Sequence, residues 1–373
     1  MNITIEQPLK KKHMTKYENG PRIIFWELTE GCNLKCIHCR ATAQPQRSPD
    51  ELSTEQAFKV IDELADLSNP LLILTGGEPL YRPDFFDIAE YACQKGLTVA
   101  MASNGTLITE PIAKKIKQVG IKRVAISFDG PFSSIHDQFR GLEGSFEQAL
   151  QGAQNVKKQG LQLQFNTTIT KHNVDYIENM ITFSKENEVD ALHLFMLVPV
   201  GCGVQIVESN MLSSKKYEEV LEWFYERSRE VDFEIRATCA PHYYRIMRQK
   251  AKEKGERITV QSHGMAAVTK GCLAGTGVCF ISHKGDIRPC GYLPVTAGSI
   301  LNQSFKDIWK NSTVLQQLRN TGLIEGKCGQ CEYLHVCSGC RARAYYETGS
   351  YLTEEPYCHY IPKRTVSLQH REI

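Results

Sequence analysis

Hydrophobic and polar residues alternate along residues 22–198 as short apolar runs separated by amphipathic segments. Between the first two runs, Ala57, Val60, Ile61 and Leu64 share one face of a helix expected over 54–67, which Ser53 or Thr54 can cap. Strands spaced by helices of this length predict repeated βαβ units and a parallel sheet. The apolar runs are rich in β-branched and aromatic residues, and they predict strands at 22–28, 71–76, 98–103, 123–130, 161–169 and 191–198.

Six strands are too few to close an eight-stranded barrel, so we expect an α/β fold with an open, partial (β/α)6 barrel of the TIM type over residues 21–209. The chemistry of such folds gathers at the carboxyl ends of the strands. Residues 1–20 are expected to form a polar N-terminal arm, and residues 210–264 a charge-rich helical bridge. Cysteine, glycine and short turns dominate residues 265–373, which predicts a small domain held together by metal instead of a large core.

Composition narrows the classes of function. The 373-residue chain carries a formal net charge of +2, so no general field draws it to nucleic acid or to an anionic membrane. No apolar run approaches about 20 residues, which argues against a membrane span, and no secretory signal is visible at the N-terminus. We therefore predict a cytoplasmic protein. Its fourteen cysteines indicate metal or redox chemistry in a reducing compartment, although Cys93, Cys202 and Cys239 stand apart and are expected to be small buried residues.

Three cysteines crowd into the stretch TEGCNLKCIHCRA, residues 29–41, directly after the first predicted strand. Soft thiolates placed close together select zinc or an iron–sulfur cluster. A structural zinc site takes four ligands, and His38 cannot easily turn back to the ion that the adjacent Cys39 would bind. A four-iron cluster held by three thiolates instead leaves one iron open. The residues therefore favour a cluster, with a structural zinc loop as the alternative.

The C-x3-C-x2-C spacing of Cys32, Cys36 and Cys39 resembles that of radical S-adenosylmethionine (SAM) enzymes. TGGEP (75–79), SNGT (103–106) and SFDG (127–130) close the following strands, as motifs do in that family. The resemblance implies an N-terminal 4Fe–4S cluster on the three cysteines and SAM on its open iron, a pair that generates a 5′-deoxyadenosyl radical able to take hydrogen from an unactivated carbon. It also implies that Glu78 holds the methionine amine, and that the remaining contacts to SAM come from Gly76, Gly77, Ser103, Asn104, Ser127, Asn166 and Arg140.

Eight further cysteines lie between residues 272 and 358, and their spacing resembles the SPASM (Twitch-like) iron–sulfur domain of radical SAM maturases. SFKDIW, residues 304–309, lies where that domain has a short capped helix. The resemblance implies one or two auxiliary 4Fe–4S clusters, and the CxxC spacing by itself also permits a pair of zinc ribbons. The implied ligand sets are Cys272, Cys279, Cys290 and Cys340 for one cluster, and Cys328, Cys331, Cys337 and Cys358 for the other.

Four longer stretches, at 27–41, 238–249, 270–300 and 337–358, resemble the anaerobic heme synthases of the siroheme-dependent pathway. That family converts two propionates of iron-coproporphyrin III to vinyl groups, giving protoheme. Loss of carbon dioxide from a propionate radical requires one more electron to leave. The resemblance therefore implies a low-potential electron donor of the ferredoxin or flavodoxin type, an unknown electron acceptor and an iron-porphyrin substrate.

A flat macrocycle with four carboxylates needs an apolar slot with cationic ends. Tyr243, Tyr244, Arg245 and Arg248 in APHYYRIMRQ offer such groups, with His242 as a candidate axial ligand to iron, although an amphipathic bridging helix explains the same residues.

Three alternative functions remain at this point. Related tetrapyrrole enzymes, namely the didecarboxysiroheme deacetylase and the heme d1 maturation type, share the layout. A SPASM peptide-modifying maturase would use the same clusters on a peptide. A non-catalytic iron–sulfur electron carrier explains the cysteines but gives GGEP and SNGT no role.

Overall fold

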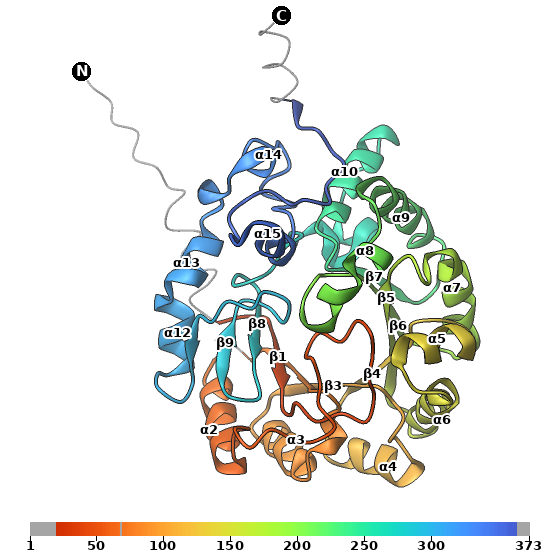
Figure 1. Ribbon diagram of the computed structural model, residues 1–373, viewed down its shortest axis with the longest axis vertical. Coiled ribbons are helices and arrows are strands. Elements are labelled where there is room, and N and C mark those ends of the chain that lie inside the picture. The colour runs from red at the N-terminus through yellow and green to blue at the C-terminus, as the bar shows by residue number, and fades with distance from the viewer. Residues whose placement is uncertain (1–19, 68, 364–373) are drawn as a thin grey trace, which may run out of the picture.

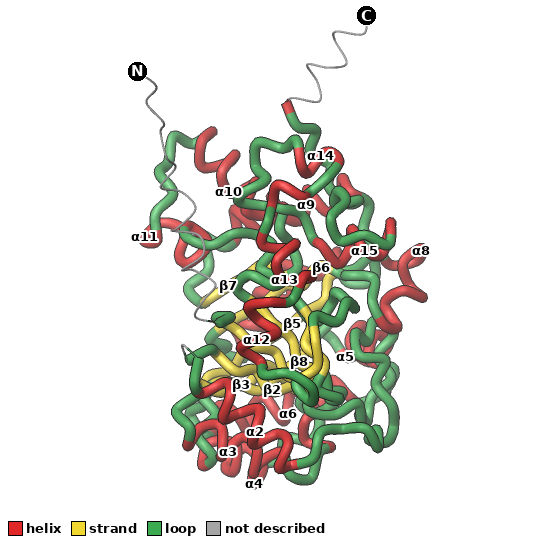
Figure 2. Tube along the Cα trace, turned by 90° about the vertical axis from the view of Figure 1, so that its left-hand side faces the viewer, coloured by secondary structure: helices red, strands yellow, loops and turns green. Residues whose placement is uncertain are grey.

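The computed structural model describes residues 20–67 and 69–363, so the expected N-terminal arm lies outside the described residues except for Gly20. A sheet runs through the middle of the molecule, and helices surround it on its outer side (Figure 1). Viewed from the side, the sheet lies between a layer that contains α2, α3 and α4 and the segments that carry the C-terminal helices (Figure 2).

All six predicted strands are present, and they pair in parallel in the order in which they occur along the chain. The register pairs Glu27 with Thr75, the last residues of β1 and β2, at one edge of the sheet. It pairs Ser127, the last residue of β4, with Asn166, and β5 continues beyond this pair to Ile169. This confirms the α/β fold with a partial barrel. The strands are β1 (Ile23–Glu27), β2 (Leu71–Thr75), β3 (Thr98–Ser103), β4 (Arg123–Ser127), β5 (Gln162–Ile169) and β6 (Ala191–Met196).

Two further parallel strands extend the sheet at its two sides, and neither follows from the hydrophobic pattern. β7 (Glu234–Thr238) pairs with β6 inside the segment expected to be helical. Its residues are only half-buried or exposed and include Arg236, because it is the last strand on that side. β8 (Val278–Ile281) comes from the cysteine-rich segment and pairs with β1. The strands of the partial barrel and the first strand of the C-terminal domain therefore belong to one sheet.

A short antiparallel extension completes the sheet, which has the order β10-β9-β8-β1-β2-β3-β4-β5-β6-β7 in the described part of the chain. β9 (Asp286–Arg288) turns back from β8, and β10 (Gly298–Ser299) pairs with β9. Because β8 and β9 are joined through the Lys284–Gly285 turn, Cys290 follows closely after a strand that is anchored to the barrel.

The helices follow the predicted amphipathic segments. Ser53 caps α2 in a capping box with Gln56, and Ala57, Val60, Ile61 and Leu64 are buried on the face that packs on the sheet, as predicted. Ser304 caps the short helix expected near SFKDIW. The α-helices are α2 (Thr54–Ala65), α3 (Phe85–Gln94), α4 (Glu110–Gln118), α5 (Ser133–Arg140), α6 (Ser145–Lys158), α7 (Ile177–Glu186), α8 (Val207–Asn210), α9 (Ser214–Arg227), α10 (His242–Glu253), α11 (Val260–His263), α12 (Phe305–Asn311), α13 (Thr313–Arg319), α14 (Gly326–Gly329) and α15 (Arg341–Thr348).

Two apolar cores hold these elements. The larger core lies between the sheet and its covering helices and extends into the C-terminal region through Phe305 and Trp309 of α12. The smaller one, which we call the C-terminal core, consists of Val198, Leu293, Leu318, Cys340 and Ala342.

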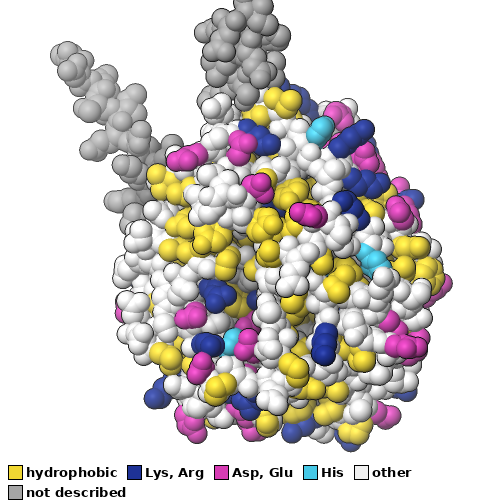
Figure 3. Space-filling view, in the orientation of Figure 1, with side chains coloured by type: hydrophobic (Ala, Val, Ile, Leu, Met, Phe, Trp, Pro, Cys, Tyr) yellow, Lys and Arg dark blue, Asp and Glu magenta, His cyan; other side chains and the backbone are white. Residues whose placement is uncertain are grey.

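No helix among the described residues is long and apolar enough to cross a membrane. On the face shown in Figure 3, basic and acidic side chains are interspersed, in keeping with a net charge near zero.

Candidate active site

The loop that carries Cys32, Cys36 and Cys39 is fixed by backbone contacts on both sides. The N–H of Cys32 donates to the carbonyl of Gln44 (2.8 Å), and the N–H of Ile37 donates to the carbonyl of Phe139 in α5 (3.1 Å). On the other side, the N–H of Cys202 in the 3-10 helix η3 (Gly201–Ile206) donates to the carbonyl of Cys39 (2.9 Å). The loop therefore lies at the carboxyl ends of the strands, where the sequence predicts the site.

Each of the three sulfurs faces hydrogen-bond donors. Cys32 Sγ accepts from the N–H of Leu34 (3.4 Å), and Cys39 Sγ accepts from the N–H of Ala43 (3.5 Å). Cys36 Sγ accepts from Nη1 of Arg140 (3.7 Å). Such donors stabilise negative charge on sulfur and tune the potential of iron–sulfur clusters.

Without metal, two thiols of this loop, those of Cys32 and Cys36, hold their protons more tightly than a free cysteine does. Burial raises the pKa of Cys32 to about 12 and raises that of Cys36, against the opposing charge of Arg140. A metal centre must therefore displace these protons when it forms. Three soft sulfurs with N–H donors suit an iron–sulfur cluster, so the donor set fits the group that the sequence predicts.

Glu78 is fully buried at the end of β2 and accepts hydrogen bonds at both carboxylate oxygens. Ser103 Oγ lies 3.0 Å from each oxygen, the N–H of Asn104 donates to Oε2 (2.8 Å) and the N–H of Leu80 donates to Oε1 (3.2 Å). Burial outweighs these donors and raises the pKa of Glu78 to about 7. A desolvated carboxylate with such a pKa is well suited to bind an ammonium group.

Gly76 and Gly77 place this carboxylate beside the cysteine loop. A Cβ at Gly77 would lie 2.4 Å from the carbonyl oxygen of Gly31, and one at Gly76 would lie 2.8 Å from the carbonyl oxygen of Thr29. The N–H of Glu78 donates to that same Gly31 carbonyl (2.8 Å). The two glycines thus allow the end of β2 to pack closely against the backbone that leads into the cysteine loop.

Ser103 and Asn104 connect the carboxylate to the cysteine loop. Asn104 Nδ2 donates to Oδ1 of Asn33 (2.8 Å) and lies 3.8 Å from Cys32 Sγ. Asn33 Nδ2 in turn donates to Oγ1 of Thr106 (2.8 Å). Asn33 and Thr106 are functional candidates that the sequence reasoning missed, although both lie within motifs it singled out.

Arg140 forms an ion pair with Asp129, which follows β4 and is fully buried. Arg140 Nη2 lies 2.6 Å from Asp129 Oδ2, and His38 Nε2 lies 3.4 Å from the same oxygen. Burial raises the pKa of Asp129, but Arg140 and His38 outweigh it and hold that pKa below its usual range. Asp129 was not named as a site residue, although SFDG contains it.

Ser127, the last residue of β4, lies opposite Asn166, which is within β5. The side-chain oxygen of Asn166 accepts from Nε2 of Gln164 (2.7 Å). Their predicted contact with SAM stays a prediction, as do the contacts predicted for the other strand-end residues.

Arg40, directly after the third cysteine, joins this site to the C-terminal domain. Its Nη2 pairs with Glu27 Oε2 (2.6 Å), its Nη1 donates to the carbonyl of Gly291 (3.2 Å), and its guanidinium lies 4.6 Å from the centroid of the Phe280 ring. His283 Nδ1 lies 2.8 Å from the second oxygen of Glu27. The cysteine loop is therefore tied to the segment that contains Cys290.

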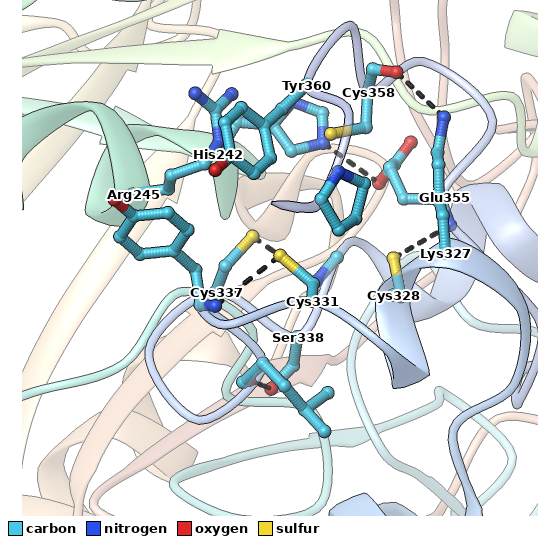
Figure 4. Close-up of a pocket in the computed structure, with 14 residues that line it drawn as sticks. His242, Arg245, Lys327, Cys328, Cys331, Cys337, Ser338, Glu355, Cys358 and Tyr360 are labelled. Carbon is cyan, nitrogen blue, oxygen red and sulfur yellow. Dashed lines mark hydrogen bonds and ion pairs between the residues drawn. The ribbon is translucent and has the colours of Figure 1, made fainter. Parts of the chain in front are cut away.

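Cys328, Cys331, Cys337 and Cys358 all line one hollow (Figure 4). Four cysteine ligands of one zinc ion would converge on a point about 2.3 Å from each sulfur. Among the described residues, no three His, Cys, Asp or Glu side chains are grouped closely enough to hold a single metal ion. The arrangement suits a larger group held at its corners.

The sulfurs around this hollow also have donors and positive charges beside them. Cys328 Sγ accepts from the N–H of Glu355 (3.3 Å), and Cys337 Sγ from that of Gly339 (3.5 Å). Arg245 and Lys327 oppose the effect of burial on the pKa of Cys358. Nearby cations and N–H groups stabilise an anionic cluster with its thiolates.

In the other predicted set, Cys272, Cys290 and Cys340 lie near one another. Cys279, the fourth member, is near Cys290 but belongs to a different core from Cys340. Cys340 belongs to the C-terminal core, Cys290 packs against it, and Cys272 is close enough to both for its charge to raise their pKa. Cys279 lies fully buried in β8 within the larger core, where its S–H donates to the carbonyl of Arg288 (3.5 Å).

The five candidate substrate residues all lie on α10. His242 is buried in the wall of the hollow, 3.8 Å from Glu355, and burial lowers its pKa to about 3. Arg245 pairs with Glu218 through both nitrogens (2.6 and 2.7 Å), and Tyr243 packs edge-on against Phe224. These contacts are those of a packed bridging helix, so a role of these residues in binding substrate stays a prediction.

Arg248 differs from these residues because it is only partly buried. Its Nη1 donates to the carbonyl of Tyr244 (2.9 Å), and the loss of water around it lowers its pKa. Of the five candidates on α10, it is therefore the best placed to meet an external carboxylate.

Arg343 and Glu355 form a buried ion pair that sequence reasoning missed. Both side chains are fully inaccessible, and Arg343 Nε donates to Glu355 Oε1 (2.9 Å). Glu355 also accepts from the N–H of Cys340 (2.6 Å), so the pair lies between the two predicted auxiliary cysteine sets. Arg343 lies in CSGCRAR and Glu355 in TEEPYC, and apart from their opposite charges nothing in these stretches indicates that the two residues form a pair.

Comparison with known proteins agrees with this geometry. Residues 26–184 match the Radical SAM superfamily, and residues 272–341 match the SPASM iron-sulfur cluster-binding domain. Over 349 residues the chain is 50% identical to a protein of Methanosarcina barkeri named AdoMet-dependent heme synthase, covering 94% of this chain and 99% of that protein. A second protein of that organism, named Fe-coproporphyrin III synthase, is 30% identical over 372 residues, covering 95% of this chain and 92% of that protein.

Solved structures show the same fold at low identity. SuiB of Streptococcus suis bound to S-adenosylmethionine superposes with a TM-score of 0.73 at 17% identity, covering 96% of this chain and 84% of that one. The two domain matches make SAM and 4Fe–4S clusters the cofactors and make the chain an enzyme, which excludes the electron-carrier reading. The chain belongs to the radical SAM superfamily, in the SPASM-containing family that includes the AdoMet-dependent heme synthases.

Proposed function

We propose that this enzyme oxidatively decarboxylates two propionate side chains of iron-coproporphyrin III to vinyl groups and so forms protoheme. One observation carries the proposal: identity of 50% to the AdoMet-dependent heme synthase of Methanosarcina barkeri extends over 94% of the chain, both domains included. The site supports it because the cysteine loop at the strand ends is joined by Arg40 to a domain built for iron–sulfur clusters.

The residues of the first site have separable tasks. Cys32, Cys36 and Cys39 would hold the cluster that, with SAM, supplies a hydrogen-abstracting radical. Glu78 binds the ammonium group of SAM in a desolvated cradle, and Arg140 is placed beside Cys36 to meet the carboxylate. The burial of Cys32, Glu78 and Arg140 excludes water from this part of the site, which protects a carbon radical from side reactions.

The electron balance gives the second domain its role. Removing a hydrogen atom from the β-carbon of a propionate leaves a carbon radical. Breaking the bond to the carboxylate then gives carbon dioxide and a vinyl group, and one electron must leave the substrate. The auxiliary cysteine sets would hold the group that accepts or relays this electron, and a ferredoxin or flavodoxin would supply the electron that starts each turnover.

The proposal is tested by anaerobic turnover with SAM, a reductant and iron-coproporphyrin III. We expect protoheme, with two 5′-deoxyadenosine molecules per protoheme formed because each propionate requires one abstraction. The Cys36→Ala variant serves as the control and forms neither product. Formation of 5′-deoxyadenosine that is indifferent to the porphyrin, with no vinyl product, would overturn the proposal.

The alternative that the enzyme is a didecarboxysiroheme deacetylase has one observation in its favour. The chain is 30% identical, over 95% of its length, to the protein named Fe-coproporphyrin III synthase. A didecarboxysiroheme deacetylase would lose acetate groups from its substrate instead of propionate carboxylates. Offering didecarboxysiroheme and iron-coproporphyrin III in parallel separates the two, since mass spectrometry distinguishes the products.

A further inference from the structure

Cys239, set aside in the sequence as an isolated cysteine, lies one residue beyond the carboxyl end of β7. Its backbone has φ of 54°, in the left-handed region that residues other than glycine rarely adopt. Its carbonyl accepts hydrogen bonds from the hydroxyl of Tyr217 (3.1 Å) and from Nη2 of Arg343 (2.9 Å). Strain of this kind persists where surrounding contacts impose it, and it concentrates at functional sites.

The side chain of Cys239 lies among other cysteines. Cys239 and Cys290 both pack against the C-terminal core, which contains Cys340. The segments of Cys239 and Cys272 run side by side, since a Cβ at Gly271 would lie 2.7 Å from the Cα of Pro241. The hydroxyl of Tyr292 is also hydrogen-bonded to the Cys239 thiol. Cys239 is thus the neighbour that Cys272, Cys290 and Cys340 share.

Cys279 has none of these features. Of the cysteines in its predicted set, only Cys290 influences its pKa, which burial raises to about 12. Its S–H is already used by the carbonyls of Arg288 and Phe280 (3.5 and 3.9 Å), and its side chain is part of the larger core. Cys279 is therefore a packed strand residue.

We infer that Cys239 is the fourth cysteine ligand of the auxiliary cluster that Cys272, Cys290 and Cys340 hold, and that Cys279 is not a ligand. A four-iron cluster offers four corners to thiolates, and here four cysteines from separate segments of the chain meet at one place. The inference rests on the iron–sulfur domain and not on the identity of the substrate.

This assignment changes where the cluster is anchored. Cys239 follows a barrel strand, whereas Cys272, Cys290 and Cys340 belong to the C-terminal domain. The cluster would then bridge the two domains at the carboxyl edge of the sheet, where the groups that act on substrate gather. Such a place suits an electron acceptor for the substrate radical.

The test compares Cys239→Ala with Cys279→Ala in a chain that also carries Cys32→Ala, Cys36→Ala and Cys39→Ala, so that only auxiliary clusters contribute. Iron and sulfide are quantified anaerobically, and electron paramagnetic resonance spectra are recorded as isolated and after reduction. We expect Cys239→Ala to lose about one iron, with a three-iron signal, or to lose one whole cluster of about four irons. Cys279→Ala is expected to keep the iron content and spectrum of the parent.

Unchanged iron and spectrum in Cys239→Ala would overturn the inference, as would loss of the cluster in Cys279→Ala alone. If Cys239→Ala does not accumulate as folded protein, Cys239→Ser decides the matter. Its oxygen can still bind iron, so we expect a retained cluster with shifted g values, and an unshifted spectrum refutes the assignment. Because no porphyrin is present, these outcomes are independent of the proposed substrate.

Discussion

Arg140 lies between a buried carboxylate and a cysteine of the N-terminal loop: its Nη2 is 2.6 Å from Asp129 Oδ2, and its Nη1 is 3.7 Å from Cys36 Sγ. The carboxylate fixes the guanidinium at the edge of the cysteine loop. The same contact keeps the Asp129 charge paired in a place with no access to water.

Replacing Arg140 with methionine would leave the Asp129 carboxylate buried and unpaired. We expect the free energy of unfolding to fall by about 3–5 kcal/mol, because removing one partner exposes the full cost of the other buried charge. Urea unfolding under anaerobic conditions, followed by tryptophan fluorescence, measures this.

The double variant Asp129→Asn/Arg140→Met provides the control. It should be destabilised less than Arg140→Met alone, since no charge is left unpaired. Equal losses in the two variants would show that the ion pair contributes nothing.

The pKa of Glu78 predicts a pH dependence of SAM binding. Below pH 7 the carboxyl is protonated in the free enzyme, so pairing with an ammonium group must first expel a proton. SAM affinity should therefore rise by up to about tenfold between pH 6 and pH 7.5, and it should level off as the amine itself deprotonates near about pH 8. Isothermal titration calorimetry on the reconstituted protein measures the dissociation constant.

Glu78→Gln should weaken SAM binding and flatten this pH profile, whereas Glu110→Gln, at an exposed position that starts α4, should change neither. A Glu78→Gln protein that binds SAM with wild-type affinity at each pH would remove Glu78 from the site.

Gly77→Ala tests the packing between GGEP and the cysteine loop. The new Cβ would meet the carbonyl oxygens of Gly31 and Glu30 at 2.4 and 2.7 Å, and backbone atoms cannot move aside cheaply. We expect the loop to shift, with loss of SAM binding and less iron bound per chain. Gly277→Ala, whose Cβ would have an ordinary 3.4 Å contact with a leucine side chain, should keep both. Normal SAM binding by Gly77→Ala would contradict the close approach.

Arg343→Met tests the buried pair with Glu355. Arg343 also donates to the Tyr217 hydroxyl (2.8 Å) and to the Leu197 carbonyl (3.3 Å). Its loss therefore leaves several buried polar groups without a hydrogen-bond donor and leaves the Glu355 charge without a partner. A decrease of about 3–5 kcal/mol in the free energy of unfolding is expected.

The matched control is Arg227→Met, which removes an exposed pair with Glu178 and should leave the unfolding free energy close to that of the wild type. Comparable effects of the two substitutions would mean that the burial of Arg343 is energetically unimportant.

The sequence by itself determined the local elements and the position of the cysteine loop at the carboxyl ends of the strands. The six runs of β-branched and aromatic residues predicted β1–β6, because a strand buried on both faces must be apolar along its length. The cysteine loop, GGEP and SNGT were predictable because the carboxyl ends of neighbouring parallel strands meet at one edge, so short motifs placed there must come together.

Only the tertiary structure decided the contacts between distant segments. β7 escaped prediction because a strand with one neighbour tolerates charged residues such as Arg236, and its pattern then lacks the apolar signal. Asp129 and Glu355 became recognisable when their burial and their arginine partners were known. The grouping of Cys239 with Cys290 and Cys340, and the separation of Cys279, depend on how β7 and β8 are placed on opposite sides of β1–β6. The spacing of cysteines along the chain does not show which distant thiols lie close together, because the packing of the elements sets the distance between those thiols in space.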